Sequence, residues 1–183
     1  PNGNGGWFSS LKNAGLLDLI HENGIEWLNV FAVDNVLQRI ADPCFIGATI
    51  TENRSVGAKV VCKNHPDEKV GVMCLKDNHP SIVEYYELTP ELRDAVDEDG
   101  EPAYNFGVIL NYLFKESELE DICENTLPLH IVEKKIPYID DAGTLIKPEE
   151  PNGYKFETLI LDMIQMMDTC LPFEVERDKE FAP

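Results

Sequence analysis

The sequence predicts an α/β fold, and three observations support this class. The first 41 residues run in the order loop, helix, strand and helix, and an acidic residue stands at the end of the strand. From residue 48 onwards, short β-type segments alternate with polar turns. Near the C-terminal end, apolar residues recur at the three- and four-residue spacing of an amphipathic helix. Helices interspersed with buried strands are typical of a layered α/β domain.

Composition is that of one globular domain or a large piece of one, with 183 residues of which 43% are hydrophobic. The formal charge of −19 argues against a nucleic-acid partner, because such binding relies on clustered Lys and Arg. The sequence shows neither an apolar run of about 20 residues nor a signal-peptide pattern, so we expect no membrane partner. Five cysteines, scattered without Cys-x-x-Cys spacing, predict a reducing, cytoplasmic compartment.

The N-terminal elements are predicted from local patterns. Residues 1–6 form a turn-rich loop whose three glycines permit positive φ. The apolar spacing over residues 7–20 predicts a helix, which Asn23-Gly24 ends. Residues 27–33 are rich in strand formers, and a short helix over 36–41 is predicted to end at Asp42-Pro43.

Asp34 is the first candidate for chemistry, because it follows the predicted strand directly. In open α/β sheets, ligands bind beyond the carboxyl ends of the strands. Strand-end aspartates also cap the helix that follows them. The residue pattern alone therefore leaves Asp34 as either a helix cap or a ligand-binding group.

The middle of the chain reads as short strands with turns. Strands are predicted over 58–62, 70–75 and 82–88, with residues 76–80 joining the last two as a hairpin. The charged residues 91–100 predict an exposed helix or excursion that ends in a turn. Glu84 is then either a solvent-facing strand residue or a ligand group.

The C-terminal third ends in helical and strand patterns. Ser117 and Glu120 have capping-box spacing, which predicts a helix over 117–125. Residues 136–146 predict a hairpin around a turn at 140–143. The apolar stripe over 156–167 predicts a helix, and residues 171–175 predict a final strand.

Two polar groups have competing interpretations. Cys62, His65, Cys74 and His79 include the ligand types of a zinc site, but both histidines precede proline in hairpin-like turns, which favours a structural role. Lys155 immediately precedes the apolar stripe, so it is predicted near a helix N-terminus, where anions are favoured. Most lysines are simply solvated, which is the alternative for Lys155.

Seven blocks of the sequence match a known family in order and span nearly the whole chain. They are Pro-Asn-Gly-Asn-Gly-Gly at 1–6, Ala-Val-Asp-Asn-Val-Leu at 32–37, Ala-Asp-Pro-Cys-Phe-Ile-Gly at 41–47, Gly-Ala-Lys-Val-Val at 57–61, Ile-Val-Glu-Tyr at 82–85, Lys-Lys-Ile-Pro-Tyr at 134–138, and Leu-Ile-Lys-Pro at 145–148 with Pro-Asn-Gly-Tyr-Lys at 151–155. On these blocks the chain resembles the eukaryotic UDP-N-acetylglucosamine (UDP-N-acetylhexosamine) pyrophosphorylases.

The resemblance implies a Rossmann-like nucleotidyltransferase fold (GT-A-like), with a mixed sheet flanked by helices. It implies an enzyme that makes UDP-N-acetylglucosamine and pyrophosphate from UTP and N-acetylglucosamine 1-phosphate with Mg²⁺. A UDP-glucose or broad UDP-sugar pyrophosphorylase is the alternative within the enzyme class. A non-catalytic sugar-nucleotide-binding module is the alternative outside it.

Roles for individual residues also follow from the resemblance. Gly3 and Asn4 would approach the uracil, Asp34 would hold the metal, and Lys155 would neutralise the phosphates, so Asp34 and Lys155 are the expected catalytic residues. The amino sugar would be held by the backbone at Gly71, the carboxylate of Glu84 and the amide of Asn105.

The chain departs from the family pattern in two places. The family segment Asn-x-Gly-Asn-Ile is Asn-Phe-Gly-Val-Ile at 105–109, so Val108 replaces the second amide. The glycine-rich nucleotide loop expected upstream is absent from these 183 residues. We therefore expect residues 1–183 to be the second part of a catalytic domain whose N-terminal portion is missing, with little or no activity alone.

Overall fold

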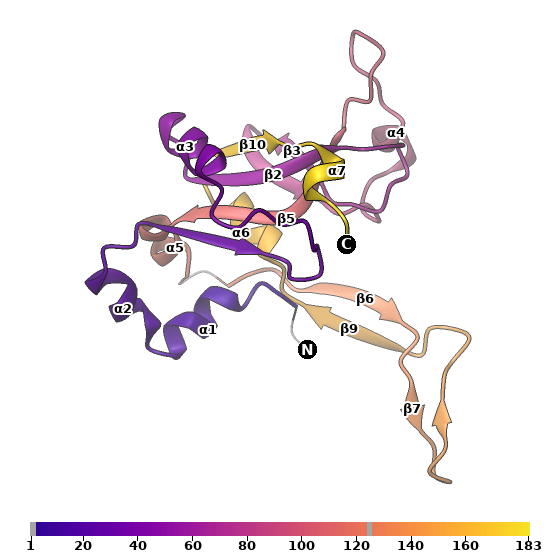
Figure 1. Ribbon diagram of the computed structural model, residues 1–183. Helices are drawn as coiled ribbons and strands as arrows, with labels where there is room; N and C mark the ends of the chain where they lie inside the picture. The colour runs from indigo at the N-terminus through magenta and orange to yellow at the C-terminus, as the bar shows by residue number, and fades with distance from the viewer. Residues whose placement is uncertain (1–2, 124–125) are drawn as a thin grey trace.

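The computed structural model describes residues 3–123 and 126–183, which form a mixed α/β fold around one main sheet (Figure 1). In chain order the elements are α1 (Trp7–Asn13), α2 (Leu16–Glu22), β1 (Trp27–Phe31), α3 (Pro43–Thr51), β2 (Val56–Cys62), β3 (Val72–Lys76), β4 (His79–Val83), α4 (Pro90–Arg93), β5 (Phe106–Lys115), α5 (Glu116–Cys123), β6 (His130–Lys134), β7 (Tyr138–Ile139), β8 (Leu145–Ile146), β9 (Gly153–Glu157), α6 (Ile160–Gln165), β10 (Cys170–Glu174) and α7 (Arg177–Glu180). The predicted fold class is confirmed.

The main sheet is organised around β5, its longest strand. The order is β10-β2-β5-β3-β4, with β10 parallel to β2 and the other neighbours antiparallel. Strand β2 runs along one edge of β5, while β3 and β1 share the other edge: β3 pairs at Gly107, and β1 pairs from Asn111 to Lys115. A gap of three residues, 108–110, therefore separates the two strands along that edge.

An irregularity in β5 falls in this same gap. Ala58 of β2 pairs with Tyr112, yet Val60 pairs with Val108, so β5 carries extra residues between these two pairs. Leu110 adopts a left-handed φ of 52°, which non-glycine residues seldom adopt. Bulges of this kind bend a strand and re-aim its side chains, and they often lie beside functional sites.

Both faces of β2 are covered. Val56, Ala58 and Val60 point into the main core, which also includes Phe8 of α1 and Ile164 of α6. On the other face, a Cβ at Gly57 would lie 2.6 Å from a ring carbon of Phe45, so α3 packs there at close range. This two-sided burial is the reason why every residue from 56 to 61 is buried.

Two small ribbons project from the body of the molecule (Figure 1). Strands β6 and β9 pair in antiparallel register from His130 opposite Glu157 to Lys134 opposite Gly153, and β7 pairs with β8 beyond them. The N-terminal loop meets the base of this arm, because Gly3 forms a parallel bridge with Thr158.

The predicted helix over 36–41 is wrong, because these residues form turns. The helix begins instead at Pro43, where the Asp42 carboxylate accepts a 3.0 Å hydrogen bond from the backbone N–H of Cys44. Asp-Pro is an N-terminal signal here, since proline at the first helical position needs no N–H partner. The predicted helix over 7–20 is divided into α1 and α2 at Gly15, whose φ is 72°.

The helix predicted over 156–167 is also partly wrong. Phe156 belongs to strand β9 and pairs with Ile131, and α6 begins only at Ile160. Pairing with β6, which is distant in sequence, overrides the local helical spacing. Lys155 consequently lies inside a strand, not at a helix N-terminus.

Most of the other elements agree with the predictions. The structure confirms the strand at 27–31, the β7–β8 hairpin and the final strand. A hairpin also joins β3 and β4, but its turn is residues 77–78 and β4 ends at Val83, so the strand predicted over 82–88 is mostly wrong, because residues 85–87 form a turn. The helix predicted from 117 begins at Glu116, and its predicted end at 124–125 lies outside the described residues. None of the described helices has the length and apolar character required to cross a membrane.

Candidate functional site

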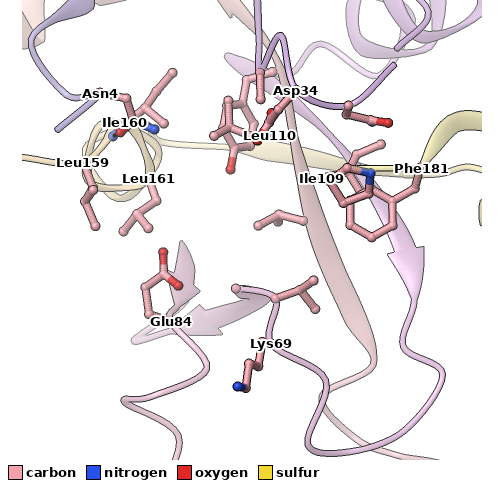
Figure 2. A pocket seen from close by; sticks show the side chains of 17 residues that line it. Asn4, Asp34, Lys69, Glu84, Ile109, Leu110, Leu159, Ile160, Leu161 and Phe181 are labelled. Atoms are coloured by element: carbon pink, nitrogen blue, oxygen red, sulfur yellow. Dashed lines mark hydrogen bonds between the residues drawn. The ribbon is translucent and has the colours of Figure 1, made fainter. Parts of the chain in front are cut away.

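A cavity of about 240 Å³ opens at the gap between β1 and β3 (Figure 2). Its floor is the irregular part of β5, Val108, Ile109 and Leu110. The turn after β1 supplies Asp34, and the residue before β3 supplies Gly71. The missing strand pairing thus becomes a recess whose rim carries residues from the ends of two strands.

Asn4 lines the cavity, and its position is fixed by the beginning of α6. Its side-chain Oδ1 accepts a 2.9 Å hydrogen bond from the N–H of Ile160, while the N–H of Gly5 donates to the carbonyl of Thr158. Gly3 is required for this approach, because a Cβ there would lie 2.1 Å from the Thr158 carbonyl oxygen. Asn4 and Gly3 line a second recess that adjoins the first.

Asp34 lies exposed in the turn that follows β1, at the rim of the cavity. Its interpretation as a helix cap is wrong, because the next helix begins at Pro43 with Asp42 as its cap. The neighbouring Asn35 is buried and holds the turn in place: its Nδ2 donates to the Glu180 carbonyl at 2.7 Å, and its Oδ1 accepts from the Ala182 N–H at 2.8 Å.

Glu84 enters the cavity from the side opposite Asp34 in Figure 2, just beyond the end of β4. Burial raises the pKa of the Glu84 carboxyl above its ordinary value, and the negative charge of Glu87 raises it further. Gly71 lies beside it, since a Cβ at Gly71 would approach the Glu84 Oε2 to 3.8 Å. Together they form a partly buried carboxylate next to accessible backbone.

A polar pair that the sequence interpretation missed supports this wall. His130 of β6 and Asp162 of α6 are joined by a 2.9 Å contact between Nε2 and Oδ2, and Nδ1 of His130 lies 3.8 Å from Glu87. Burial raises the pKa of Asp162, although the bond to His130 opposes this. No local pattern in the sequence predicts this pair, because residues 130 and 162 are brought together only by the pairing of β6 with β9.

Three of the predicted residues do not line this cavity: Gly3, which lines only the adjoining recess, Lys155 and Asn105. Lys155 forms an ion pair with Glu157 on the same face of β9. Asn105 precedes β5, and its side-chain Oδ1 accepts a 2.9 Å hydrogen bond from the N–H of Lys63. The cation that does line the cavity is Lys69, which the sequence interpretation had not selected.

Val108 also lines the cavity, although it was noted in the sequence only as a departure from the family pattern. Its N–H donates to the Gly71 carbonyl at 2.9 Å, so its backbone joins the two strands beside Glu84. A Cβ at Gly71 would lie 3.3 Å from Val108 Cγ2. The apolar side chain therefore packs next to the carboxylate wall.

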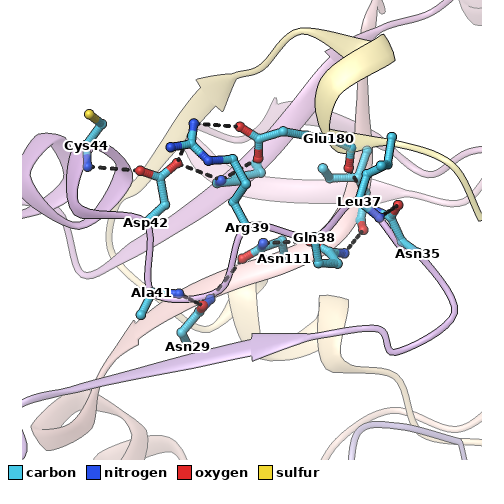
Figure 3. Close-up of polar contacts among 12 residues, drawn as sticks. Asn29, Asn35, Leu37, Gln38, Arg39, Ala41, Asp42, Cys44, Asn111 and Glu180 are labelled. Atoms are coloured by element: carbon cyan, nitrogen blue, oxygen red, sulfur yellow. Dashed lines mark hydrogen bonds and ion pairs between the residues drawn. The ribbon is translucent and has the colours of Figure 1, made fainter.

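A buried ionic network holds the C-terminal segment over the cavity (Figure 3). The Lys59 side chain is 0% exposed, and its Nζ lies 2.9 Å from Asp42 Oδ2 and 2.5 Å from Glu180 Oε2. Arg39 lies 3.5 Å from the other Glu180 oxygen. Because Phe181 lines the cavity, this network positions one of its walls.

Two of the four side chains weighed as zinc ligands, Cys62 and His65, have other partners in the structure. Among the described residues, the metal-ligand side chains whose donor atoms converge are His21, Glu116 and Glu120. Cys62 instead donates to Glu174 at 3.0 Å, and His65 pairs with Asp67.

The mixed sheet, with a cavity beyond the carboxyl end of β1, gives this chain the type of α/β fold in which ligands bind at the ends of strands. Residues 1–183 match the family described as UTP–glucose-1-phosphate uridylyltransferase along their whole length, and the chain belongs to this family.

Particular relatives carry more specific names. The chain is 41% identical over 186 residues to UDP-N-acetylhexosamine pyrophosphorylase-like protein 1 of Mus musculus, covering 100% of this chain and 37% of that protein. It is 38% identical over 192 residues to UDP-N-acetylglucosamine pyrophosphorylase of Saccharomyces cerevisiae, covering 100% of this chain and 40% of that protein.

Structural comparison agrees with the sequence relationship. A crystal structure from Entamoeba histolytica, of a protein assigned as a UDP-N-acetylglucosamine pyrophosphorylase, superposes with a TM-score of 0.88 at 38% identity. It covers 99% of this chain and 45% of that chain. The 183 residues thus span less than half the length of the relatives that they match.

Proposed function

We propose that this chain is the second part of the catalytic domain of a UDP-N-acetylglucosamine pyrophosphorylase. The whole enzyme would make UDP-N-acetylglucosamine and pyrophosphate from UTP and N-acetylglucosamine 1-phosphate. The observation that carries the proposal is convergence: Asn4, Asp34, Gly71 and Glu84 come from four separate segments and line one cavity. The names of the relatives support the same chemistry.

The chemistry requires positioning more than a protein nucleophile. A phosphate oxygen of the sugar phosphate attacks the α-phosphorus of UTP, and the bond from this phosphorus to the bridging oxygen of pyrophosphate breaks. Protein groups accelerate such a step by alignment and by stabilising the charge that develops on the phosphates. The role of this chain is therefore to hold the two substrates in line.

The uridine end of the site is assigned to Gly3 and Asn4. The Asn4 Oδ1 is engaged by Ile160, which leaves the amide group oriented at the cavity surface. Close packing of Gly3 on Thr158 keeps this loop against the cavity. A planar base would lie along this loop.

The sugar end is assigned to Glu84 and Gly71. A carboxylate can accept hydrogen bonds from two sugar hydroxyls, and the partial burial of Glu84 strengthens such bonds. Asn105 is a weaker candidate for this end, since its amide is bound to the backbone of Lys63 away from the cavity.

Mg²⁺ is the proposed cofactor, and Asp34 is its proposed protein ligand. An exposed carboxylate at the rim fits the usual Mg²⁺ arrangement, in which one or two carboxylates and substrate phosphates share the ion. When bound, the ion would neutralise charge on the phosphates. Asn35 fixes the turn, so it would hold the Asp34 carboxylate in position.

The phosphate cation is proposed to be Lys155, as the family resemblance implies. It lies outside the cavity and is paired with Glu157, so it would have to leave that partner to reach a phosphate. Lys69 lines the cavity and is the competing candidate. The two are distinguished by measuring how strongly pyrophosphate competes with UDP-N-acetylglucosamine for binding to Lys155→Met and to Lys69→Met. The substitution that weakens this competition identifies the lysine that binds phosphate.

The chain alone is proposed to bind nucleotide sugar but to turn over little or no substrate, because it lacks a glycine-rich nucleotide loop. Release of pyrophosphate from UTP and N-acetylglucosamine 1-phosphate by the 183-residue chain would contradict this. We also propose a cytoplasmic location, which the free thiols of Cys44, Cys62, Cys74 and Cys170 support.

The proposed function is tested by calorimetric titration of the chain with UDP-N-acetylglucosamine. Glu84→Gln keeps the size of the side chain but removes its charge, and we expect at least about a 10-fold weaker Kd, since hydrogen bonds to charged groups contribute about 1.5–3 kcal/mol. Glu91→Gln is the control, because Glu91 is an exposed glutamate of α4 that does not line the cavity. Equal affinity in Glu84→Gln and the unmodified chain would refute the sugar-site assignment.

A second candidate, a UDP-glucose or broad UDP-sugar pyrophosphorylase, is favoured by one observation. Val108 contributes an apolar surface beside Glu84 where the family pattern has an amide. Such a wall supplies no side-chain hydrogen bond to distinguish an acetamido group from a hydroxyl. Titration with UDP-glucose and UDP-N-acetylglucosamine decides between the two candidates, and Val108→Asn is expected to shift the ratio of affinities towards the amino sugar.

A further inference from the structure

A second group of converging polar side chains lies between α2 and α5, away from the cavity. Nε2 of His21 lies 3.1 Å from Oε1 of Glu116 and 3.2 Å from Oε1 of Glu120. All three donor atoms lie within 4.8 Å of one another. We propose that these three side chains bind a divalent transition-metal ion, of which Zn²⁺ is the representative.

The secondary structure brings these donors to one point. Glu116 and Glu120 are four residues apart in α5, so they lie on the same face of that helix. His21 stands in the last turn of α2, and its ring faces this pair. The start of α5 is held in place, because the N–H of Glu116 donates to the Glu26 carbonyl at 2.9 Å.

The burial of Glu116 favours a positive charge beside its carboxylate. Its side chain is only 9% exposed, whereas His21 and Glu120 are 50% and 42% exposed. A buried carboxylate is costly unless it is paired. Here its partner is an imidazole that also contacts Glu120, so two acidic groups share one ring nitrogen. A divalent ion would satisfy both carboxylates at once.

The chemistry and spacing of the donors fit zinc. One imidazole and two carboxylates, with a water molecule as fourth ligand, belong to the donor types found in three-ligand zinc sites. Tetrahedral bonds of about 2.0–2.1 Å place ligand atoms about 3.3 Å apart. The observed separations of 3.1 and 3.2 Å from Nε2 therefore require only a small outward movement of the side chains.

This site is distinct from the proposed nucleotide-sugar site. Trp27, the first residue of β1, pairs with Lys115, which immediately precedes Glu116, whereas Asp34 follows the other end of β1. Figure 1 shows α2 and α5 together at the end of the sheet away from the C-terminus. An ion bound here would join the α1–α2 pair to α5 and would make no contact with the cavity.

The test is calorimetric titration of the full 183-residue chain with ZnCl₂ under reducing conditions. We expect one ion bound through these residues, and an increase in Tm on addition of one equivalent, since a ligand that binds the folded state stabilises it. His21→Gln and Glu120→Gln each remove one donor from an exposed position, and each is expected to weaken the affinity at least 10-fold. Circular dichroism establishes that both variants fold.

Two matched controls make the result specific. Glu118→Gln alters a neighbouring acidic residue of α5 that pairs with Lys115, and Glu22→Gln alters an exposed acidic residue of α2; both are expected to retain full affinity. Co²⁺ in place of Zn²⁺ is expected to give a spectrum without a thiolate charge-transfer band. Unchanged affinity in His21→Gln and Glu120→Gln, or a thiolate band that is lost on alkylation of the cysteines, would overturn the proposal.

Discussion

The ammonium of Lys59 lies 2.5 Å from the Glu180 carboxylate, and this contact joins the centre of the sheet to the C-terminal segment. Lys59 lies in β2 and is fully buried, and Glu180 is the last residue of α7. The Glu180 carbonyl also accepts from Asn35, beside Asp34. One residue therefore connects the core, the C-terminal wall of the cavity and the turn that carries the proposed metal ligand.

Glu180→Gln is expected to lower the free energy of unfolding by about 3 kcal/mol, because removing one partner of a buried pair leaves its charge poorly compensated. Asp42 still pairs with Lys59, which keeps the loss at the lower end of the range for such changes. Urea unfolding measures it. Glu176→Gln, which breaks the exposed pair with Lys179, is the control and should cost less than about 1 kcal/mol. Similar losses in both variants would show that burial of the network contributes nothing.

The same network predicts a dependence of stability on acid. Burial alone raises the pKa of Asp42, but hydrogen bonds from Lys59 and from the Cys44 N–H, with the nearby charge of Arg39, outweigh it and lower the pKa below its usual value. A carboxyl with a lowered pKa in the folded state stabilises the fold above its unfolded pKa of about 3.9, and this stabilisation is lost as the pH falls through the folded value.

Asp42→Asn is therefore expected to be less stable than the unmodified chain at pH 6, with a difference that narrows as the pH falls below 4. Urea unfolding at a series of pH values measures it. Asp94→Asn is the control, and its effect on stability should change less with pH. The pKa of Asp94 is lowered by Arg93, but this contact is exposed to solvent. A difference for Asp42→Asn that stays constant from pH 6 to pH 3 would exclude Asp42 as the source of the acid sensitivity.

Much of the fold could be predicted from local sequence signals, and the errors have identifiable physical causes. Strands β1 and β2 follow from runs of strand formers, and the β7–β8 hairpin follows from its turn residues. Phe156 was misassigned because its partner Ile131 is distant in sequence, and helical spacing cannot reveal such pairing. Asp42-Pro43 was misread because the same dipeptide suits the end of one helix and the start of another.

The candidate site was predictable where family blocks supplied the residues. Asn4, Asp34 and Glu84 lie in these blocks and line one cavity, whereas Lys155 lies in such a block but not at the cavity. Lys59 was missed, although a lysine inside the buried run 56–61 is itself a signal of a buried ion pair. Its partners lie 17 and 121 residues away, so no local pattern could name them.

Gly3→Ala is expected to displace the N-terminal loop, because its Cβ would meet the Thr158 carbonyl oxygen at 2.1 Å. Gly15→Ala is a matched control: its φ of 72° is close to the 75° of Gly3, but a Cβ there meets nothing within 4 Å. The control should cost only the left-handed strain of about 1–2 kcal/mol, and Gly3→Ala should cost more. Thermal unfolding of the two variants measures the difference. Equal losses would mean that the Gly3 loop is not packed against Thr158.

The raised pKa of Glu84 predicts how the proposed ligand binding depends on pH. The ionised carboxylate of Glu84 can accept hydrogen bonds at both oxygens, whereas the protonated form carries an O–H donor on one of them. The affinity for UDP-N-acetylglucosamine should therefore fall as the pH drops through the raised pKa of Glu84. The affinity should begin to fall at a higher pH than the pKa of about 4.3 of a solvent-exposed glutamate. Because Glu87 contributes to the shift, Glu87→Gln should move the loss to lower pH, and Glu84→Gln should remove it. Calorimetric titrations between pH 7.5 and 4.5, with folding followed by circular dichroism, measure the three profiles. Superimposable profiles for the unmodified chain and Glu84→Gln would exclude Glu84 as the titrating ligand.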